Sequence, residues 1–193
     1  FQDLKNKVTK KTQMIFVENP GSNTFEFQDL SAIIKLAKKN NIITALDNTW
    51  GTPLFLKPLE IGFDMSISSA TKYFSGHSDV MVGTLAVNKK VFQKVNFYNR
   101  LSGYRASPDD AYLVIRGLRT LDVRLERHEK NTKEIIKFLV KQKKIVEILY
   151  PYKKGTKNYK NWKKYYKGAT GLLSLVIKAK SKNSVFKFIN SLE

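Results

Sequence analysis

The chain has 193 residues, of which 42% are hydrophobic and none is cysteine, and its formal net charge is +19. These values argue against a disordered chain and exclude disulfide bridges and thiolate metal sites, and no apolar run reaches the roughly 20 residues of a membrane-spanning helix. The positive charge is mostly lysine spread along the whole chain, which favours a solvated surface over nucleic-acid recognition, where arginine is preferred.

The first half of the chain alternates strand and helix patterns. Four short apolar runs predict buried strands, at residues 13–18, 42–48, 65–71 and 83–88. Residues 25–41 predict a helix that Asp29 or Ser31 could cap. Its apolar residues share one helical face: Leu30, Ile33, Ile34 and Ala37. Such an order is typical of an α/β fold with a mostly parallel sheet.

The second half begins with a long helical pattern, residues 107–142, which starts at Ser107-Pro108-Asp109 and has a possible break at Gly117. The sequence pattern then changes, and it predicts strands at 145–151 and 171–179, a short basic-aromatic helix or loop at 157–168, and a helix at 184–193. We therefore expect two domains, residues 1–140 belonging to a large α/β domain and residues 141–193 beginning a small α+β domain.

Polar residues follow the ends of three predicted strands, namely Ser22, Asp47 and Lys72. In a parallel sheet, functional residues collect at the carboxyl ends of the strands. The sequence therefore predicts that these three residues lie along one rim of the sheet.

Lys72 follows small and hydroxyl residues in the word SSATK. When partly buried, such a lysine loses its proton more readily and can attack carbonyl groups. Pyridoxal phosphate uses a lysine of this kind together with a carboxylate on its pyridine nitrogen, which Asp47 could supply. The hydroxyl groups of Ser69 and Thr71 could bind the phosphate. A solvated lysine and a turn aspartate remain the alternative.

Three words carry a resemblance to a known family: LDNTWGTP, SSATKYFSGHSDVMVGTLAVN and RGLRTLDVRLERH. In this order they resemble the Cys/Met-metabolism family of pyridoxal-phosphate enzymes, and the resemblance runs through nearly the whole chain. Within that family, the segment FVENPGSNTFEFQDL is most similar to the cystathionine β-lyases. The resemblance implies the fold-type-I architecture of pyridoxal-phosphate transferases.

The resemblance also implies roles for single residues. Lys72 would hold the cofactor covalently and move the α-proton of the substrate. Asp47 would pair with the pyridine nitrogen, and Thr49 would lie against the ring. These three residues would form the half of the site that accepts electrons from the substrate.

Further residues would complete the cofactor site by the same resemblance. Ser69 and Thr71 would bind the phosphate, and Ser22 would lie near the phenolic oxygen of the cofactor. His77 and Asp79 belong to the recognised word, but a hydrogen-bonded turn is the simpler interpretation for both.

Two other clusters have simpler interpretations than a binding site. Four arginines recur along the long helix and are expected to have structural or interface roles: Arg116, Arg119, Arg124 and Arg127. The aromatic cluster of Trp162, Tyr165 and Tyr166 could stack on nucleic-acid bases, but packing in the core of the small domain is the more natural role.

The resemblance implies an enzyme that cleaves cystathionine by β-elimination to homocysteine, pyruvate and ammonia in methionine biosynthesis. We expect a cytoplasmic homotetramer with a small sulfur amino acid as substrate, without specific nucleic-acid or membrane binding. Members of the family are much longer, so the chain is expected to be a central fragment that is inactive alone. The alternatives are a cystathionine γ-synthase or γ-lyase, a cysteine desulfhydrase, and a non-catalytic basic remnant.

Overall fold

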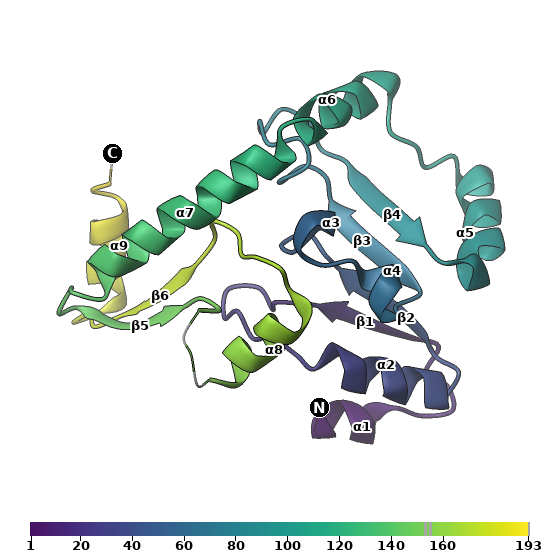
Figure 1. Ribbon diagram of the computed structural model, residues 1–193, viewed down its shortest axis with the longest axis horizontal. Helices are drawn as coiled ribbons and strands as arrows, with labels where there is room; N and C mark the ends of the chain where they lie inside the picture. The colour runs from purple at the N-terminus through teal and green to yellow at the C-terminus, as the bar shows by residue number, and fades with distance from the viewer. Residues whose placement is uncertain (153, 155, 193) are drawn as a thin grey trace.

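The computed structural model describes residues 1–152, 154 and 156–192 (Figure 1). The strands are β1 (Met14–Glu18), β2 (Ile43–Asp47), β3 (Met65–Ser69), β4 (Gly83–Val87), β5 (Ile145–Leu149) and β6 (Ser174–Ile177). The helices are α1 (Gln2–Lys7), α2 (Leu30–Lys39), α3 (Thr52–Phe55), α4 (Pro58–Ile61), α5 (Lys89–Ser102), α6 (Pro108–Leu118), α7 (Leu121–Leu139), α8 (Lys157–Tyr165) and α9 (Lys182–Ile189).

The main sheet has the strand order β1-β2-β3-β4, in which the first three strands are parallel and β4 is antiparallel to β3. This arrangement confirms the predicted α/β class with a mostly parallel sheet. The strands β5 and β6 form a separate antiparallel pair, and α7 runs from the main sheet to this pair (Figure 1).

Helix α2 forms as its sequence pattern predicts. The Asp29 carboxylate caps the helix by accepting a hydrogen bond from the Ala32 N–H, 3.3 Å away. The four residues predicted to share one face are all buried: Leu30, Ile33, Ile34 and Ala37. This face packs against Ile15, Val17 and Leu46 of the main sheet and covers one side of it.

The predicted long helix is two helices in the structure. Ser107 caps α6 by accepting a hydrogen bond from the Asp110 N–H at 3.0 Å, as expected. The chain turns after Leu118 and restarts at Leu121, so the break follows Gly117 by a single residue. A side chain at Gly117 would place its Cβ only 2.2 Å from the Ser75 carbonyl oxygen. Glycine is therefore required where α6 crosses the turn that follows β3.

Helices α1, α3, α4 and α5 were not predicted from the sequence. Helix α5 is the longest of them, and Asn88 caps it by accepting a hydrogen bond from the Val91 N–H at 3.3 Å. Val91 is the buried residue of this helix, whereas Phe92, Phe97 and Leu101 are exposed. Its apolar residues form no buried stripe in the described chain.

The C-terminal elements follow the predicted order but are shorter. The basic-aromatic segment is helical, as α8, and the last helix, α9, begins at Lys182 with a capping box between Ser181 and Ser184. Residue 193, the last of the predicted helix 184–193, lies outside the described residues. The cluster of Trp162, Tyr165 and Tyr166 packs inside the protein, with the two residues Trp162 and Tyr166 buried.

Two clusters of buried residues hold the described part of the chain together. The larger cluster joins Ile15 and Leu46 of the main sheet to Tyr150, Trp162 and Tyr166. The smaller one packs the turn after β3 against α6 and α7. Because the larger cluster combines residues from both sides of residue 140, the division into domains 1–140 and 141–193 stays a prediction.

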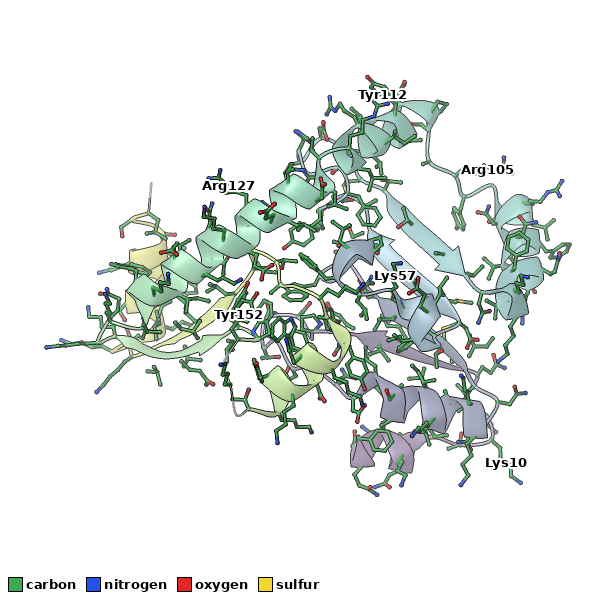
Figure 2. All side chains as sticks on the ribbon, viewed as in Figure 1. Lys10, Lys57, Arg105, Tyr112, Arg127 and Tyr152 are labelled. Atoms are coloured by element: carbon green, nitrogen blue, oxygen red, sulfur yellow. The ribbon has the colours of Figure 1, made fainter. Side chains whose placement is uncertain are left out.

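Basic side chains point outward on several sides of the molecule. Figure 2 shows Lys10, Arg105 and Arg127 at widely separated edges. This distribution matches a solvated surface. Among the described residues, none of the helices combines the length and the apolar character needed to cross a bilayer.

Candidate active site

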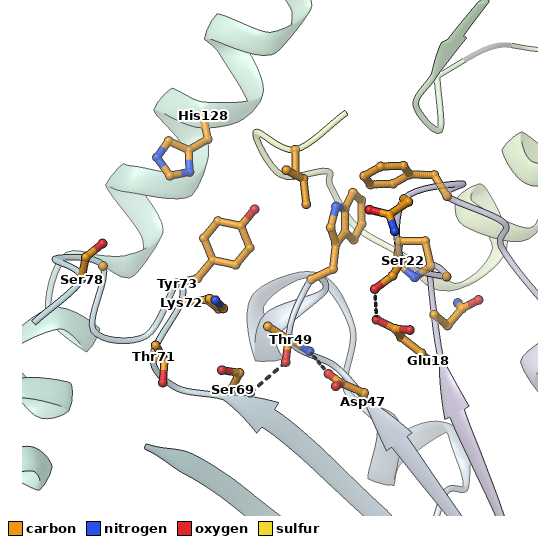
Figure 3. Close-up of a pocket in the computed structure, with 18 of the residues that line it drawn as sticks. Glu18, Ser22, Asp47, Thr49, Ser69, Thr71, Lys72, Tyr73, Ser78 and His128 are labelled. Carbon is orange, nitrogen blue, oxygen red and sulfur yellow. Dashed lines mark hydrogen bonds between the residues drawn. The ribbon is translucent and has the colours of Figure 1, made fainter. Parts of the chain in front are cut away.

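A cavity of about 1060 Å³ lies at the carboxyl ends of the parallel strands. Six residues predicted from the sequence line it: Ser22, Asp47, Thr49, Ser69, Thr71 and Lys72. Figure 3 shows Ser22 on one side of the cavity and Lys72 on the other, with Asp47 and Thr49 between them. The expectation that residues beyond three strand ends meet at one rim is therefore realised in the structure.

The floor of the cavity is tied together by the backbone and side chains of two neighbouring strands. The Thr49 N–H donates to Asp47 Oδ1 at 2.9 Å, and the Ser69 N–H donates to Thr49 Oγ1 at 2.8 Å (Figure 3). Asp47 Oδ2 accepts no hydrogen bond from the described residues. One carboxylate oxygen thus fixes the side chain while the other remains available to a ligand.

Lys72 lies on a tight turn that follows β3. Its N–H donates to the Ser69 carbonyl at 3.1 Å, and its own carbonyl accepts from the Gly76 N–H at 2.9 Å. The hydroxyl of Thr71 accepts from the Val82 N–H at 3.0 Å and donates to the Val82 carbonyl at 3.3 Å. These hydrogen bonds hold the turn on both sides of Lys72, so that its side chain lies at the cavity.

The side chain of Lys72 is exposed at the cavity. The amine accepts and donates no hydrogen bond within the described chain. The physical reason is that the cavity is open above the turn, so that no packed side chain covers the amine there.

Two arginines of the long helical segment hold the loop that contains Lys72. Arg124 Nη2 donates to the carbonyls of Tyr73 and Gly117, both at 2.8 Å, and burial lowers the pKa of its guanidinium group. Arg116 Nη2 forms an ion pair with Asp79 Oδ2 at 2.5 Å. These contacts agree with the structural role expected for Arg116 and Arg124.

The loop after β1 brings Ser22 to the opposite side. The Ser22 hydroxyl donates to Glu18 Oε1 at 2.5 Å (Figure 3). Glu18 and Asp47 are direct partners in the register of β1 and β2. The Ser22 loop therefore begins beside the carboxylate that marks the end of β2.

Several cavity residues were not predicted from the sequence. Tyr73 and His128 face each other with ring centroids 5.9 Å apart, and burial raises the pKa of the Tyr73 hydroxyl. Trp50 also lines the cavity, and its buried Nε1 has no hydrogen-bond partner among the described residues. His128 is the last residue of the word RGLRTLDVRLERH, but it lies on α7, far from the other site residues in sequence, and its place at the cavity was not predicted.

The donors and charges of the cavity match the chemistry of pyridoxal phosphate. An amine at Lys72 and a carboxylate at Asp47 suit an aldehyde and a pyridine nitrogen, respectively. Hydroxyl groups at Ser69 and Thr71 suit a phosphate. The volume lies slightly above the usual range for small-molecule sites. A cofactor of this type therefore fits the residues that are present.

A lysine and an aspartate at the strand ends of an α/β sheet, with hydroxyl groups around them, define the class of pyridoxal-phosphate enzymes. The model of the Cys/Met metabolism PLP-dependent enzyme family matches residues 1–193. The chain belongs to this family.

Individual relatives agree with the family match. Cystathionine β-lyase MetC of Escherichia coli is 35% identical over 183 residues, which cover 94% of this chain and 46% of the relative. L-alanine/L-glutamate racemase of Wolbachia pipientis is 38% identical over 176 residues, which cover 91% of this chain and 44% of the relative. The chain thus spans about half the length of the curated relatives it matches.

A solved structure shows the same fold. Cystathionine γ-lyase from Lactobacillus plantarum superposes with a TM-score of 0.92 at 26% sequence identity. The match covers 98% of this chain and 50% of the other. The structural likeness thus extends over nearly every element described above.

Proposed function

We propose that the chain is part of a pyridoxal-phosphate-dependent carbon–sulfur lyase that cleaves cystathionine by β-elimination. The observation that carries the proposal is the meeting of Lys72, Asp47 and four hydroxyl side chains in one cavity. The 35% identity to a cystathionine β-lyase supports the choice of reaction.

The cofactor, when bound, would supply a ring that accepts electrons from the bond broken at the substrate Cα. Asp47 Oδ2 would accept a hydrogen bond from the protonated pyridine nitrogen, while Oδ1 stays bound to the Thr49 N–H. The Thr49 side chain would lie against the ring, and its hydroxyl is held in place by the Ser69 N–H. The carboxylate is thus fixed in orientation before the ligand arrives.

The hydroxyl groups of Ser69 and Thr71 would bind the phosphate. Thr71 donates to the Val82 carbonyl only at 3.3 Å, so its hydrogen can turn to a phosphate oxygen while its oxygen keeps the shorter bond from the Val82 N–H. Ser22 would approach the phenolic oxygen from the opposite side.

Lys72 would perform two tasks. Its Nζ would hold the cofactor covalently and, once the substrate amine has displaced it, would remove the proton from the substrate Cα. The sulfur then leaves from Cβ as a thiolate. Cystathionine and water would give homocysteine, pyruvate and ammonia, which balances the atoms of the reaction.

The cofactor role of Lys72 is tested by absorbance. The 193-residue chain incubated with pyridoxal phosphate should develop a band near roughly 420 nm, and borohydride reduction should remove this band and leave the cofactor permanently attached to the protein. We expect Lys72→Ala to abolish the band, whereas Lys94→Ala, a lysine exposed on α5, should retain it. An unchanged band in Lys72→Ala would refute the assignment.

The reaction is tested by its products. In a chimera, residues 1–193 replace the matching segment of cystathionine β-lyase MetC from Escherichia coli. This chimera should release pyruvate from cystathionine. A 2-oxobutyrate product would contradict β-elimination and favour a γ-lyase. Pyruvate and sulfide from cysteine, but no cleavage of cystathionine, would favour a cysteine desulfhydrase.

Racemisation is the second candidate because the Wolbachia relative, named as an L-alanine/L-glutamate racemase, is 38% identical. The same Lys72 amine would remove the α-proton, and the proton would return on the opposite face. Formation of D-alanine from L-alanine by the chimera, without pyruvate from cystathionine, would establish this activity instead.

We further propose that the protein works in the cytoplasm as a homo-oligomer, a homotetramer in its complete form. The absence of cysteine and the family membership support this proposal.

The competing idea of a non-catalytic basic module predicts nucleic-acid affinity that survives moderate salt. Binding that collapses with salt would instead reflect the net charge of +19 alone.

A further inference from the structure

The loop that carries Ser22 is anchored by a residue from the other end of the chain. Asn19, the first residue after β1, is only 1% exposed. Its side-chain Nδ2 donates to the Tyr166 hydroxyl at 2.9 Å, and that hydroxyl donates to the Asn19 backbone carbonyl at 2.5 Å. One hydroxyl therefore binds both the side chain and the main chain of the same residue.

The Tyr166 hydroxyl is suited to this double contact. Burial raises the pKa of Tyr166, so the group keeps its proton and can donate at any physiological pH. The tyrosine directly follows α8, and 147 positions separate it from Asn19 in sequence. The contact consequently joins the C-terminal aromatic cluster to the first loop of the candidate site.

Asn19 also fixes the far end of the loop. Its Oδ1 accepts from the Gln28 N–H at 2.7 Å, so that one side chain bridges the beginning and the end of residues 19–28. Inside the loop, the Gly21 N–H donates to the Glu26 carbonyl at 3.1 Å and the Phe25 N–H to the Gly21 carbonyl at 3.0 Å. A displacement of Asn19 would therefore release the whole loop.

The ring of Tyr166 has a separate task. It contacts Trp50 and Phe27 edge-on, with centroids 5.6 and 5.4 Å apart. A Cβ at Gly51 would lie 2.9 Å from Tyr166 Cε1, so glycine at that position admits the ring. Since phenylalanine keeps the ring and removes only the hydroxyl, the two tasks can be separated by experiment.

We propose that Tyr166 is a positioning residue whose hydroxyl, acting through Asn19, holds the Ser22 loop in its place at the cofactor cavity. The contacts above support the role of Tyr166 in fixing the loop, whereas its effect on cofactor binding rests on the proposed function. Neither Tyr166 nor α8, which it directly follows, belongs to the motifs that indicate cofactor binding.

The test compares Tyr166→Phe with Tyr150→Phe in the 193-residue chain. Tyr150 is a matched control because it is 6% exposed against 5% for Tyr166 and its hydroxyl donates to a backbone carbonyl, that of Thr170, at 2.8 Å. Both variants remove one buried hydroxyl, but only Tyr166→Phe frees Asn19. Two quantities are measured: amide hydrogen exchange at Gly21 and Phe25, and the Kd for pyridoxal phosphate.

We expect Tyr166→Phe to speed exchange at both amides about tenfold and to raise the Kd by a similar factor, because a buried hydrogen-bonded pair is lost. Tyr150→Phe should leave both quantities unchanged even if it lowers the thermal midpoint equally. Equal exchange in the two variants, or faster exchange in Tyr166→Phe with an unaltered Kd, would overturn the proposal.

A double-mutant cycle tests whether the hydroxyl acts through Asn19. In an Asn19→Ser background, Tyr166→Phe should add no further increase in exchange or Kd. Additive effects of the two substitutions would show that the Tyr166 hydroxyl does not act through Asn19. Failure of the unmodified chain to bind pyridoxal phosphate would overturn the proposed function instead, and amide exchange would then still decide the role of Tyr166 in fixing the loop.

Discussion

Single residues at the end of the sheet opposite the cavity show how a buried charge is accommodated. Asp64 is 8% exposed, and its carboxylate accepts from the Thr44 N–H and hydroxyl through one oxygen and from Asn88 Nδ2 through the other. Burial raises the pKa of Asp64, but these hydrogen bonds and the nearby Lys90 outweigh it, so the pKa lies below its ordinary value. The charged form is therefore the one that the fold prefers.

Asp64→Asn should destabilise the protein by about 1–3 kcal/mol at neutral pH, because an amide NH₂ would face a hydrogen-bond donor. Since the folded-state pKa is lowered, the contribution of Asp64 is present above the unfolded value and is lost as pH falls through the folded value. Urea unfolding at pH 7 and at low pH should show the difference between variant and original chain shrinking with acidification.

The matched control for that measurement is Glu60→Gln on α4, whose carboxylate forms an exposed ion pair with Lys57. Exposed pairs contribute little, so this variant should stay within about 1 kcal/mol of the original. An Asp64→Asn effect that is the same at both pH values would contradict the assigned charge state.

At the scale of elements, the corner between α6 and α7 holds the loop that carries the candidate lysine. Gly117 allows α6 to touch the backbone of residues 74–75, and Arg124 spans from α7 to the carbonyl of Tyr73. Val114, Leu121 and Leu125 complete the contact by packing against this loop. The helices therefore position the turn through both main-chain contacts and side-chain packing.

Gly117→Ala should destabilise the protein by at least about 1–3 kcal/mol, because the new methyl group would meet backbone atoms that cannot rotate away. The loop with Lys72 should loosen as well, giving weaker pyridoxal-phosphate binding. Thermal unfolding and cofactor titration measure the two effects. Gly83→Ala is the control, since the nearest atom to its Cβ would be 3.9 Å away, and an equal loss in both variants would contradict the argument.

In the molecule as a whole, α2 covers one face of the main sheet, and the other face is open. Helix α2 packs on the face that contains Ile15 and Val17, whereas Phe16 and Leu85 on the other face are 58% and 49% exposed. The register places Ala45 beside Phe16 and Ile67 beside Leu85, so apolar residues from all four strands occur on the open face. Such surfaces favour association with another protein surface.

We expect the chain to self-associate in a concentration-dependent manner, and the double variant Phe16→Ser with Leu85→Ser to reduce this association. Sedimentation velocity at several concentrations is the measurement. Phe186→Ser on α9, which replaces a residue of similar exposure outside the sheet, is the control. Unchanged sedimentation of the double variant would show that another surface drives association.

Local patterns predicted much of the fold and the candidate residues of the site. Alternation of apolar runs and caps indicated the six strands, α2 and the start of α6, because each depends on neighbours within a few residues. Helix α5 was not predicted in this way, although its apolar residues recur with a helical period. The site residues Asp47 and Lys72 were indicated by strand ends and by the words around them.

By itself, the sequence determined the class of the fold, the family and the candidate cofactor residues, because these depend on short motifs and on the order of the elements. Only the tertiary structure decided that Lys72 is exposed, that His128 and Trp50 share its cavity, and that Tyr166 anchors the Ser22 loop. These features depend on how segments far apart in the chain are arranged in space, which local patterns do not specify.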